Sequence, residues 1–447
     1  MNPRLLVLTD ITSLTPRVRE PDDGQSLVRL MLYSNEIDIE GLIASSNLGH
    51  GQTCRPELIE TVVTAYGQVR DALLQHDTGY PAAEQLLACI AAGQPVAGPT
   101  VRLEDSVGPE KDTAASAWII QAARREDLRP LWIAVWGGTA DLAQALWRLR
   151  ETLSERELAH VLANLRIHAV GDQDSTGPWI KANFSNLFYI TRGFGIRGMY
   201  RGGDTSLVSA EWVETNICHE HGALGALYPN YEGGDIWSGE IGPVRGIKEG
   251  DTPSYLGLIR NGLNPAQAVG WGSWSGRCQP VGQSELRFTD AIDDSLPTTR
   301  SDKRPEMSAT YRWRPAFQND FAARLDWCVR PFTDANHPPH PVTTANRPGR
   351  LENGALTFSL STGNWLELDA SASSDPDGDR LTFHWDVYPE AGSYRGDIEI
   401  LGADRSLVRV RAPAVTQPAI LHLILTVTDS GQPPLVAYQR VILRLEP

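Results

Sequence analysis

The sequence has few cysteines and no long apolar run, and both shortages exclude classes of protein. Its five cysteines, at positions 54, 89, 218, 278 and 328, are odd in number, widely spaced and without a C-x-x-C pair. Neither a disulfide framework nor a structural zinc site is therefore predicted. No apolar stretch approaches the roughly 18–20 residues that span a bilayer, so we expect no membrane partner. The first apolar run, residues 5–8, is too short for a signal peptide. We expect either a cytoplasmic protein or an exported one, secreted or periplasmic, whose signal has been removed.

Positive charge is also in short supply. The chain carries 40 Lys and Arg against 55 Asp and Glu, a formal net charge of −15. Nucleic-acid affinity depends mainly on basic residues that neutralise phosphates, so no nucleic-acid partner is expected. Tryptophan, by contrast, is abundant, with 13 residues. Its flat ring with a polar edge suits the faces of sugars as well as protein cores.

The length of the chain and the spacing of its apolar runs predict more than one domain. A chain of 447 residues exceeds the size at which single cores stop growing, roughly 250–300 residues. Up to about residue 200, short apolar runs alternate with amphipathic stretches, which predicts a doubly wound, mostly parallel α/β sheet. Expected strands are 5–8, 39–44, 131–136 and 165–170, and expected helices are 22–34, 56–75, 81–92, 112–125 and one that begins near 141. Residues 200–330, with helical patterns near 208–218 and 253–261, are expected to complete this domain.

A different pattern begins after a Pro-rich stretch at 336–340. Proline cannot continue a helix and stiffens a connection, so we place the domain boundary there. The predicted α/β domain is 1–335, and a β-sandwich of the immunoglobulin-like type is predicted for 341–447. The expected sandwich strands are 366–369, 381–385, 406–410, 422–427 and 440–445.

The densest group of carboxylates follows the first predicted strand. Asp10 ends that strand, and Asp22 and Asp23 open the next helix. In a doubly wound sheet the ligand crevice lies at the carboxyl ends of the strands, where these three side chains would converge. Close carboxylates repel one another unless a cation neutralises them, and hard oxygen ligands suit calcium or magnesium. The alternative is that Asp22 and Asp23 simply favour the start of a helix.

Several motifs resemble known families. Some occur in the order of the metal-site segments of the inosine-uridine nucleoside hydrolases: Val7-Leu8-Thr9-Asp10, Glu20-Pro21-Asp22-Asp23, Trp136-Gly137-Gly138-Thr139-Ala140-Asp141 and Gly250-Asp251-Thr252-Pro253. The chain more closely resembles a bacterial family described as nucleoside-hydrolase-like and cellulose-binding, in the segments Glu20-Pro21-Asp22-Asp23, Ser26-Leu27-Val28-Arg29-Leu30, Tyr33-Ser34-Asn35-Glu36, Ile39-Glu40-Gly41-Leu42-Ile43, Gly250-Asp251-Thr252-Pro253-Ser254 and Asp326-Trp327-Cys328. The second resemblance runs over nearly the whole chain.

The resemblance implies a calcium site and assigns roles to its residues. Asp10 would ligate calcium and activate the attacking water, and Asp23 and Asp251 would be further carboxylate ligands. The backbone carbonyl near Ala140 would complete the set, and Asp22 would hold a sugar hydroxyl. A cation of this kind can orient water and sugar hydroxyls for attack at an anomeric carbon.

Three departures from the nucleoside-hydrolase pattern bear on the substrate. Leu8 stands where that family has its first Asp, residues 12–19 form an insertion, and Gly250 replaces the His that precedes the last metal carboxylate. The usual candidate for protonating a nucleobase is thereby missing. We therefore predict a calcium-dependent hydrolase of glycosidic bonds, with a carbohydrate or nucleoside-like small molecule as substrate. The alternative is a carbohydrate-binding protein that keeps the pocket without the chemistry, and homo-oligomer formation is left open.

Other residues are candidates with plain structural alternatives. Asn183, Trp271 and Trp274 are predicted to contact substrate, although the two tryptophans suit loop packing equally well. In the sandwich, the run 375–379 (Asp-Pro-Asp-Gly-Asp) resembles a turn of polycystic-kidney-disease-type domains. It favours a tight turn, and a calcium loop is the alternative.

Overall fold

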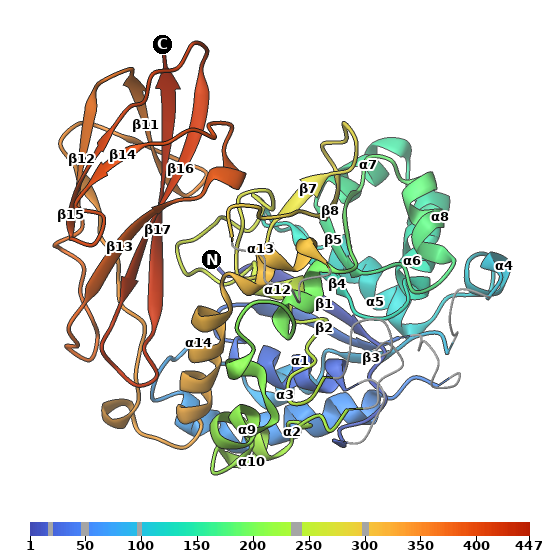
Figure 1. The fold of residues 1–447 in the computed structure, drawn as a ribbon. Helices are drawn as coiled ribbons and strands as arrows, with labels where there is room; N and C mark the ends of the chain where they lie inside the picture. The colour runs from blue at the N-terminus through green and yellow to red at the C-terminus, as the bar shows by residue number, and fades with distance from the viewer. Residues whose placement is uncertain (17–20, 46–52, 96–100, 234–243, 297–303) are drawn as a thin grey trace.

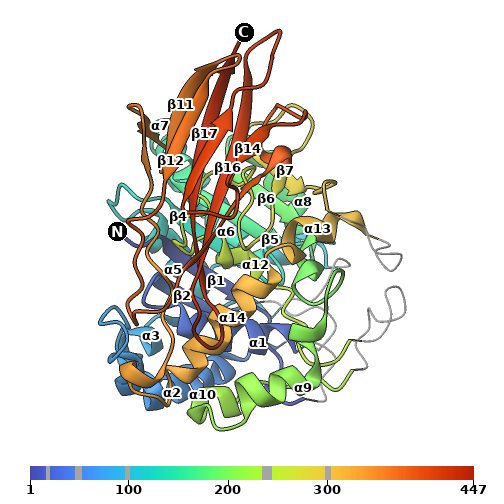
Figure 2. The same cartoon turned by 60° about the vertical axis from the view of Figure 1, so that its left-hand side comes forward.

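The structure is a computed structural model that describes the whole chain except residues 17–20, 46–52, 96–100, 234–243 and 297–303. It contains an α/β unit and a β-rich C-terminal unit that stands against one side of it (Figures 1 and 2). In the described part of the chain, no helix combines the length and the apolar character that crossing a membrane requires.

The α/β unit is built on an eight-stranded sheet. Its strand order is β3-β2-β1-β4-β5-β6-β8-β7, and every pairing is parallel except that of β7 with β8. The strands are β1 (Arg4–Thr9), β2 (Asp38–Ala44), β3 (Ile90–Ala92), β4 (Leu131–Val135), β5 (Leu165–Val170), β6 (Phe188–Arg192), β7 (Cys278–Pro280) and β8 (Arg287–Asp290). The predicted doubly wound, mostly parallel sheet is confirmed.

Helices connect the strands, as the alternation of patterns predicts. The longer ones are α1 (Asp22–Leu32), α2 (Pro56–Leu73), α5 (Ala114–Ala123), α6 (Ala140–Thr152), α7 (Glu155–Ala163), α8 (Thr176–Asn183) and α14 (Arg314–Asp326). Short helical segments are α3 (Ala83–Leu87), α4 (Leu103–Ser106), η1 (Gly195–Met199), η2 (Ser206–Val208), α9 (Ala210–Val213), η3 (Glu214–Cys218), α10 (Gly222–Ala226), α12 (Pro253–Leu256), η4 (Pro305–Met307), α13 (Ser308–Tyr311) and η5 (Phe332–Asp334). The helix predicted over 81–92 is wrong in its second half, where the chain forms β3.

Strand β1 shows why the sheet is covered on both faces. Leu5 and Val7 belong to one buried core, and Leu6 and Leu8 belong to the other. Successive side chains of a strand point to opposite faces, so a continuous apolar run is what a strand buried on both faces requires. The run 5–8 thus inserts β1 at the centre of the sheet.

The strand order reverses between β1 and β4. From β1 the chain builds outward to β3 on one side, and from β4 it builds to β8 on the other. Connections diverge at such a switch point and leave a crevice at the carboxyl ends of the strands. Residues that follow β1 and β4 are therefore placed at the edge of this crevice.

The C-terminal unit consists of two facing sheets. One has the order β10-β11-β17-β16-β13 and the other β14-β15-β12-β9. The strands are β9 (Thr344–Ala345), β10 (Arg350–Glu352), β11 (Ala355–Ser361), β12 (Trp365–Asp369), β13 (Thr382–Val387), β14 (Glu399–Leu401), β15 (Leu407–Arg411), β16 (Ala419–Thr428) and β17 (Val436–Glu446), with the turn η6 (Pro389–Ala391). All pairings are antiparallel except that of β11 with β17. A core of its own, including Leu366, Trp385 and Leu423, fills the space between the sheets, as a β-sandwich requires.

The two units share a buried junction. Tyr388, Ile424 and Tyr438 of the sandwich belong to the same buried apolar cluster as Trp313 of the α/β unit. Arg440 of β17 reaches across the junction, where its Nε donates to Leu263 O at 2.5 Å and its Nη2 to Trp271 O at 2.9 Å. The sandwich is thus packed against the α/β unit rather than tethered to it.

Candidate functional site

A pocket of about 370 Å³ opens at the carboxyl ends of four neighbouring parallel strands. Asp10 follows β1, Trp136 follows β4, Asp172 follows β5 and Gly193 follows β6, and all four line the pocket. The pocket therefore lies at the switch point of the sheet, where α/β folds bind their ligands.

Three carboxylates meet on one wall of this pocket. Asp22, Asp23 and Asp251 each place an oxygen within 4.8 Å of the others. The first two open α1 and the third precedes α12, so residues more than 200 positions apart share the site. This spacing lets three oxygens converge on one divalent cation.

Strand β1 and helix α1 hold Asp23 in place. The Thr9 hydroxyl donates a hydrogen bond to Asp23 Oδ1, and Asp23 is 5% exposed. The residue at the N-cap of α1 is Pro21, and Asp22 and Asp23 occupy the first turn. Their charges suit the positive end of the helix, but their convergence on Asp251 goes beyond what a helix start requires.

Asp251 is the most buried of the three carboxylates. It is 2% exposed, and its Oδ2 has no hydrogen-bond partner. Burial raises the pKa of Asp251 well above its ordinary value, and the charges of Asp23, Asp22 and Asp10 raise it further. A shielded carboxylate oxygen without a donor is costly, and a cation would remove that cost.

Asp10 lies beside this group of three and faces the turn after β4. A Cβ added to Gly137 would come within 2.5 Å of Asp10 Cγ and 2.7 Å of Asp10 Cβ. Asp10 lines the pocket but is not among the three carboxylates whose oxygens lie within 4.8 Å of one another. Its charge nonetheless acts on Asp251.

A buried ion pair fixes the segment that carries Asp251. Arg29 Nε donates to Glu249 Oε2 at 2.6 Å, and both side chains are 0% exposed. The Tyr228 hydroxyl donates to Glu249 at 2.6 Å, and that of Thr252 at 2.8 Å. Such a pair holds its geometry because removal of one partner leaves a buried charge uncompensated. Local sequence patterns do not predict the ion pair of Arg29 with Glu249, because it joins residues 220 positions apart.

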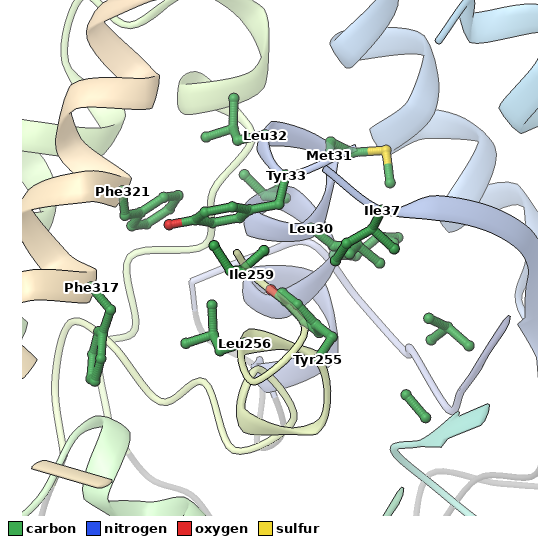
Figure 3. Close-up of a cluster of buried hydrophobic side chains, with 14 of the residues drawn as sticks. Leu30, Met31, Leu32, Tyr33, Ile37, Tyr255, Leu256, Ile259, Phe317 and Phe321 are labelled. Atoms are coloured by element: carbon green, nitrogen blue, oxygen red, sulfur yellow. The ribbon is translucent and has the colours of Figure 1, made fainter. Parts of the chain in front are cut away.

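Apolar packing on the same elements reinforces this arrangement. Figure 3 shows Met31 and Tyr33 at the end of α1 grouped with Tyr255 of α12 and Phe321 of α14. These side chains are buried, and the guanidinium carbon of Arg29 lies 3.7 Å from the centre of the Phe321 ring. The elements that bear Asp22, Asp23 and Asp251 are thus locked together by one core.

Basic side chains also line the pocket, and local sequence patterns did not predict them. Lys248 Nζ lies 3.6 Å from Asp22 Oδ2. Arg192 Nε donates to Asp290 Oδ1 at 2.6 Å, while Arg197 of η1 lines the pocket without an ion pair to any described residue. Burial raises the pKa of Tyr200 to about 12, so its hydroxyl remains a donor at neutral pH. Arg192 and the residues after it lie at the carboxyl end of β6. This position is the sequence signal from which their place in the pocket could have been predicted.

Four predicted site residues lie away from the pocket lining. Ala140 is buried at the start of α6. Asn183 is exposed at the end of α8, where it accepts a bond from Arg150 at 3.2 Å. Trp271 lines a separate cavity of about 650 Å³. Trp274 is 2% exposed, with its ring nitrogen 3.5 Å from the Tyr438 hydroxyl. None of these four residues is among those that line the pocket with Asp10, and their contact with substrate or ion stays a prediction.

Gly250 leaves space where a side chain would stand. A Cβ at this position would meet Asp22 Oδ2 at 3.2 Å and Ile196 at 3.8 Å. The pocket therefore extends past Gly250 toward η1, whose residues Ile196 and Arg197 line it.

A second acidic group occurs in the sandwich. Asp375, Asp377 and Asp379 each place an oxygen within 4.8 Å of the others. Asp375 Oδ1 accepts bonds from the backbone nitrogens of Asp377 at 2.9 Å and Asp379 at 3.1 Å. Asp377 also accepts a bond at 2.7 Å from the backbone nitrogen of His337. These bonds are those of a capped turn, so the turn and calcium-loop interpretations both stay open.

Comparison with known proteins identifies the family. Residues 4–278, more than half of the chain, match the family described as cellulose-binding Sde182, nucleoside hydrolase-like domain, and residues 365–445 match the C-terminal domain of cellulose-binding protein Sde0182. The chain belongs to this nucleoside hydrolase-like, cellulose-binding family. No curated protein matches the chain.

One solved structure agrees with this membership, and two others show only a weak likeness. A nucleoside hydrolase-related hypothetical protein from Saccharophagus degradans, described as associated with carbohydrate metabolism, is 32% identical over 100% of both chains, with a TM-score of 0.80. An inosine-guanosine nucleoside hydrolase is 11% identical over 74% of this chain and 99% of its own, with a TM-score of 0.34. A PKD domain is 20% identical over 23% of this chain and 91% of its own, with a TM-score of 0.16.

Proposed function

We propose that the protein is a calcium-dependent hydrolase of glycosidic bonds that acts on a carbohydrate. The ligands in this proposal are Asp23 and Asp251, which belong to the group of three converging carboxylates, and Asp10, which lines the pocket beside that group and which the resemblance assigns as a ligand. Asp22 serves as the acceptor for a sugar hydroxyl because one of its oxygens already faces Lys248. The carbonyl near Ala140 is left out, since Ala140 does not line the pocket.

The observation that carries the proposal is the unpartnered Oδ2 of Asp251. It is shielded from solvent among carboxylates that raise the pKa of Asp251. The donor set consists of hard oxygens, which suits calcium, and it is open to a pocket large enough for a sugar. The residues present therefore fit the ion that the family resemblance implies. When bound, calcium would supply positive charge that favours ionised water and would orient vicinal sugar hydroxyls.

The protein's own groups supply the rest of the chemistry. Asp10 would accept the proton of the attacking water, a role that requires its carboxylate to face the pocket as it does. Asp22 would fix the sugar by accepting a bond from one of its hydroxyls. Attack of water at the anomeric carbon would form a C–O bond as the bond to the leaving group breaks, through an oxocarbenium-like state that the carboxylates of the pocket would stabilise by their charge. Asp10 would take one proton of the water, and the leaving group would take a proton from solvent.

The substrate is a glycoside rather than a free nucleoside. Gly250 stands where the resemblance places a histidine for the nucleobase, so the residue that would protonate a base is absent from that position. The solved relative is described as associated with carbohydrate metabolism and the family as cellulose-binding. Both descriptions favour a sugar-derived leaving group.

A second candidate is a carbohydrate-binding protein without turnover. The family description favours it, because it speaks of cellulose binding. The pocket favours the enzyme, because a binder has little use for the water-activating carboxylate of Asp10. The two candidates predict the same calcium site and differ in whether a bond is cleaved.

A substrate screen with and without a calcium chelator tests the proposal. Oligosaccharides, aryl furanosides and nucleosides are incubated with the full chain, and release of reducing sugar is measured. Asp10→Asn serves as the inactive control. Chelator-sensitive release that Asp10→Asn lacks supports the hydrolase. Calcium-dependent binding of a glycan with no release from any substrate would overturn the hydrolase and leave the binding protein.

A further inference from the structure

We infer that the pocket recognises an anionic carbohydrate, with Arg197 as the residue that binds its negative group and Arg304 as a nearby positive charge. The inference rests on the proposed function, because it assumes that the pocket binds a sugar. It names the chemical class of that sugar: one that carries a carboxylate, phosphate or sulfate group on the side away from the calcium ligands.

The first observation is the position of Arg197. It belongs to η1, and it lines the pocket. Gly250 keeps the space between Asp22 and Ile196, the neighbour of Arg197, free of a side chain, since a Cβ there would lie 3.2 Å from Asp22 Oδ2 and 3.8 Å from Ile196. A ligand that fills this space reaches η1.

The second observation is that Arg197 lacks an acidic partner. Its Nη1 is shielded from solvent and has no hydrogen-bond partner, and no described carboxylate forms an ion pair with it. The chain has 55 acidic residues against 40 basic ones, so acidic partners are plentiful elsewhere. Two other basic residues line the pocket: Arg192, which is paired with Asp290, and Lys248, which lies near Asp22. Burial of a guanidinium without an acidic partner is costly, and the negative charge of a ligand in the pocket would offset that cost.

A second arginine lies over the same aromatic ring as Arg197. The guanidinium carbon of Arg304 lies 3.8 Å from the centre of the Phe194 ring, and that of Arg197 lies 5.1 Å from it. Arg304 also forms no ion pair with a described carboxylate. Two unpaired guanidinium groups around one ring form a cationic patch, and such groups present planar forks of donors that match carboxylate and phosphate oxygens.

The charges of the three carboxylates and of Arg197 favour one orientation of the ligand in the pocket. The three carboxylates repel an anion, whereas a calcium ion bound beside them would attract sugar hydroxyls. Tyr200 also lines this pocket. A sugar in the pocket would place its hydroxyls toward Asp22 and its anionic group toward Arg197.

Matched pairs of sugars test the inference. Galactose is compared with galacturonate, and glucose with glucose 6-phosphate and glucose 6-sulfate, so that each pair differs in one anionic group. Binding to the calcium-loaded full chain is measured by ligand-observed NMR at low and high salt. We expect the anionic member of at least one pair to bind about tenfold more tightly, the order of one charge-assisted hydrogen bond, and the preference to shrink as salt screens it.

Variants separate the arginines from the ion. Arg197→Gln should reduce the anion preference to near unity and leave calcium affinity unchanged, and Arg304→Gln should weaken it in part. Arg395→Gln, on an exposed loop of the sandwich, is the matched control and should keep it.

The outcomes distinguish this inference from the proposed function. A preference that survives in Arg197→Gln would place the anionic group on the calcium ion and overturn the inference alone. Equal binding of neutral and anionic sugars would also overturn it and leave the proposed function standing. If no sugar of either charge binds in the presence of calcium, both fall.

Discussion

Gly137 lies so close to Asp10 that it has no room for a side chain. An added Cβ would come within 2.5 Å of Asp10 Cγ and 2.7 Å of Asp10 Cβ. Because Asp10 Cβ is fixed at the end of β1, a larger residue at 137 must displace either the carboxylate or the turn after β4. The side chain that we assign to water activation thus depends on a glycine from a neighbouring strand.

Gly137→Ala is therefore expected to disable the site. Overpacking of this kind costs about 1–3 kcal/mol of stability, and displacement of Asp10 should lower both calcium affinity and turnover. Gly193→Ala is the control, since Gly193 lines the same pocket and an added Cβ there would have nothing within 4 Å. Calcium titration and thermal unfolding of both variants measure the difference. Equal behaviour of the two variants would contradict the importance of this contact.

Asp10 and Asp22 are expected to differ in function. Asp10→Asn should abolish turnover with some loss of calcium affinity, because it removes the proton acceptor. A loss on the order of 10²–10⁴-fold in rate is the range for general-base catalysis. Asp22→Ala should largely retain calcium binding and weaken sugar recognition. Steady-state kinetics with calorimetry on each variant tests this, and loss of calcium binding in Asp22→Ala would make Asp22 a ligand instead.

The sequence could predict the centre of the sheet and one side of the site. The uninterrupted apolar run of β1, followed at once by Asp10, identifies a buried strand and the place where its carboxyl end leads. Asp22 and Asp23 follow from the start of the next helix. The convergence of Asp251 with them depended on the family resemblance, because nothing local to residue 251 indicates which distant segment it meets.

Other features could not be predicted from local patterns. Strand β3 has only three residues, two of them Ala, which suits a helix equally well. Arg197 lies on a short 3₁₀ segment without periodicity, so its place in the pocket is set by tertiary contacts alone. Trp271 and Trp274 are predicted to contact substrate, yet Trp274 packs at the domain junction. Composition cannot distinguish a ring that faces a ligand from one that faces another domain.

The C-terminal sandwich is expected to fold alone, with reduced stability. Residues 341–447 contain a complete core between two sheets, but the isolated segment would expose Tyr388, Ile424 and Tyr438, which are buried at the junction. The segment should give a β-type circular dichroism spectrum and a cooperative urea transition at a lower midpoint than that of the sandwich within the full chain. A disordered segment would contradict its independence.

Stability is expected to fall on mild acidification because of a buried histidine. Burial, together with the charge of Arg192, lowers the pKa of His168 to about 3. Its pKa in the unfolded chain is about 6.5. Between these values the unfolded chain binds a proton that the folded protein does not, so stability present above pH 6.5 is lost as pH falls toward 3. The slope from this one group reaches about 1.4 kcal/mol per pH unit.

Urea unfolding at several pH values measures this effect. His168→Gln should show a shallower decline between pH 6.5 and 4. His160→Gln, on the exposed side of α7, should keep the native slope. An unchanged slope in His168→Gln would show that other groups control the acid transition.

The central claim is that the carboxylates around Asp251 form the calcium site, and calcium titration calorimetry on matched variants tests it most directly. The native chain should bind one calcium ion in this pocket. Asp251→Asn should lose that ion, because the variant replaces the buried carboxylate whose Oδ2 lacks a partner. Asp377→Asn, in the acidic turn of the sandwich, should keep it. Retention of the ion in Asp251→Asn together with its loss in Asp377→Asn would contradict the account.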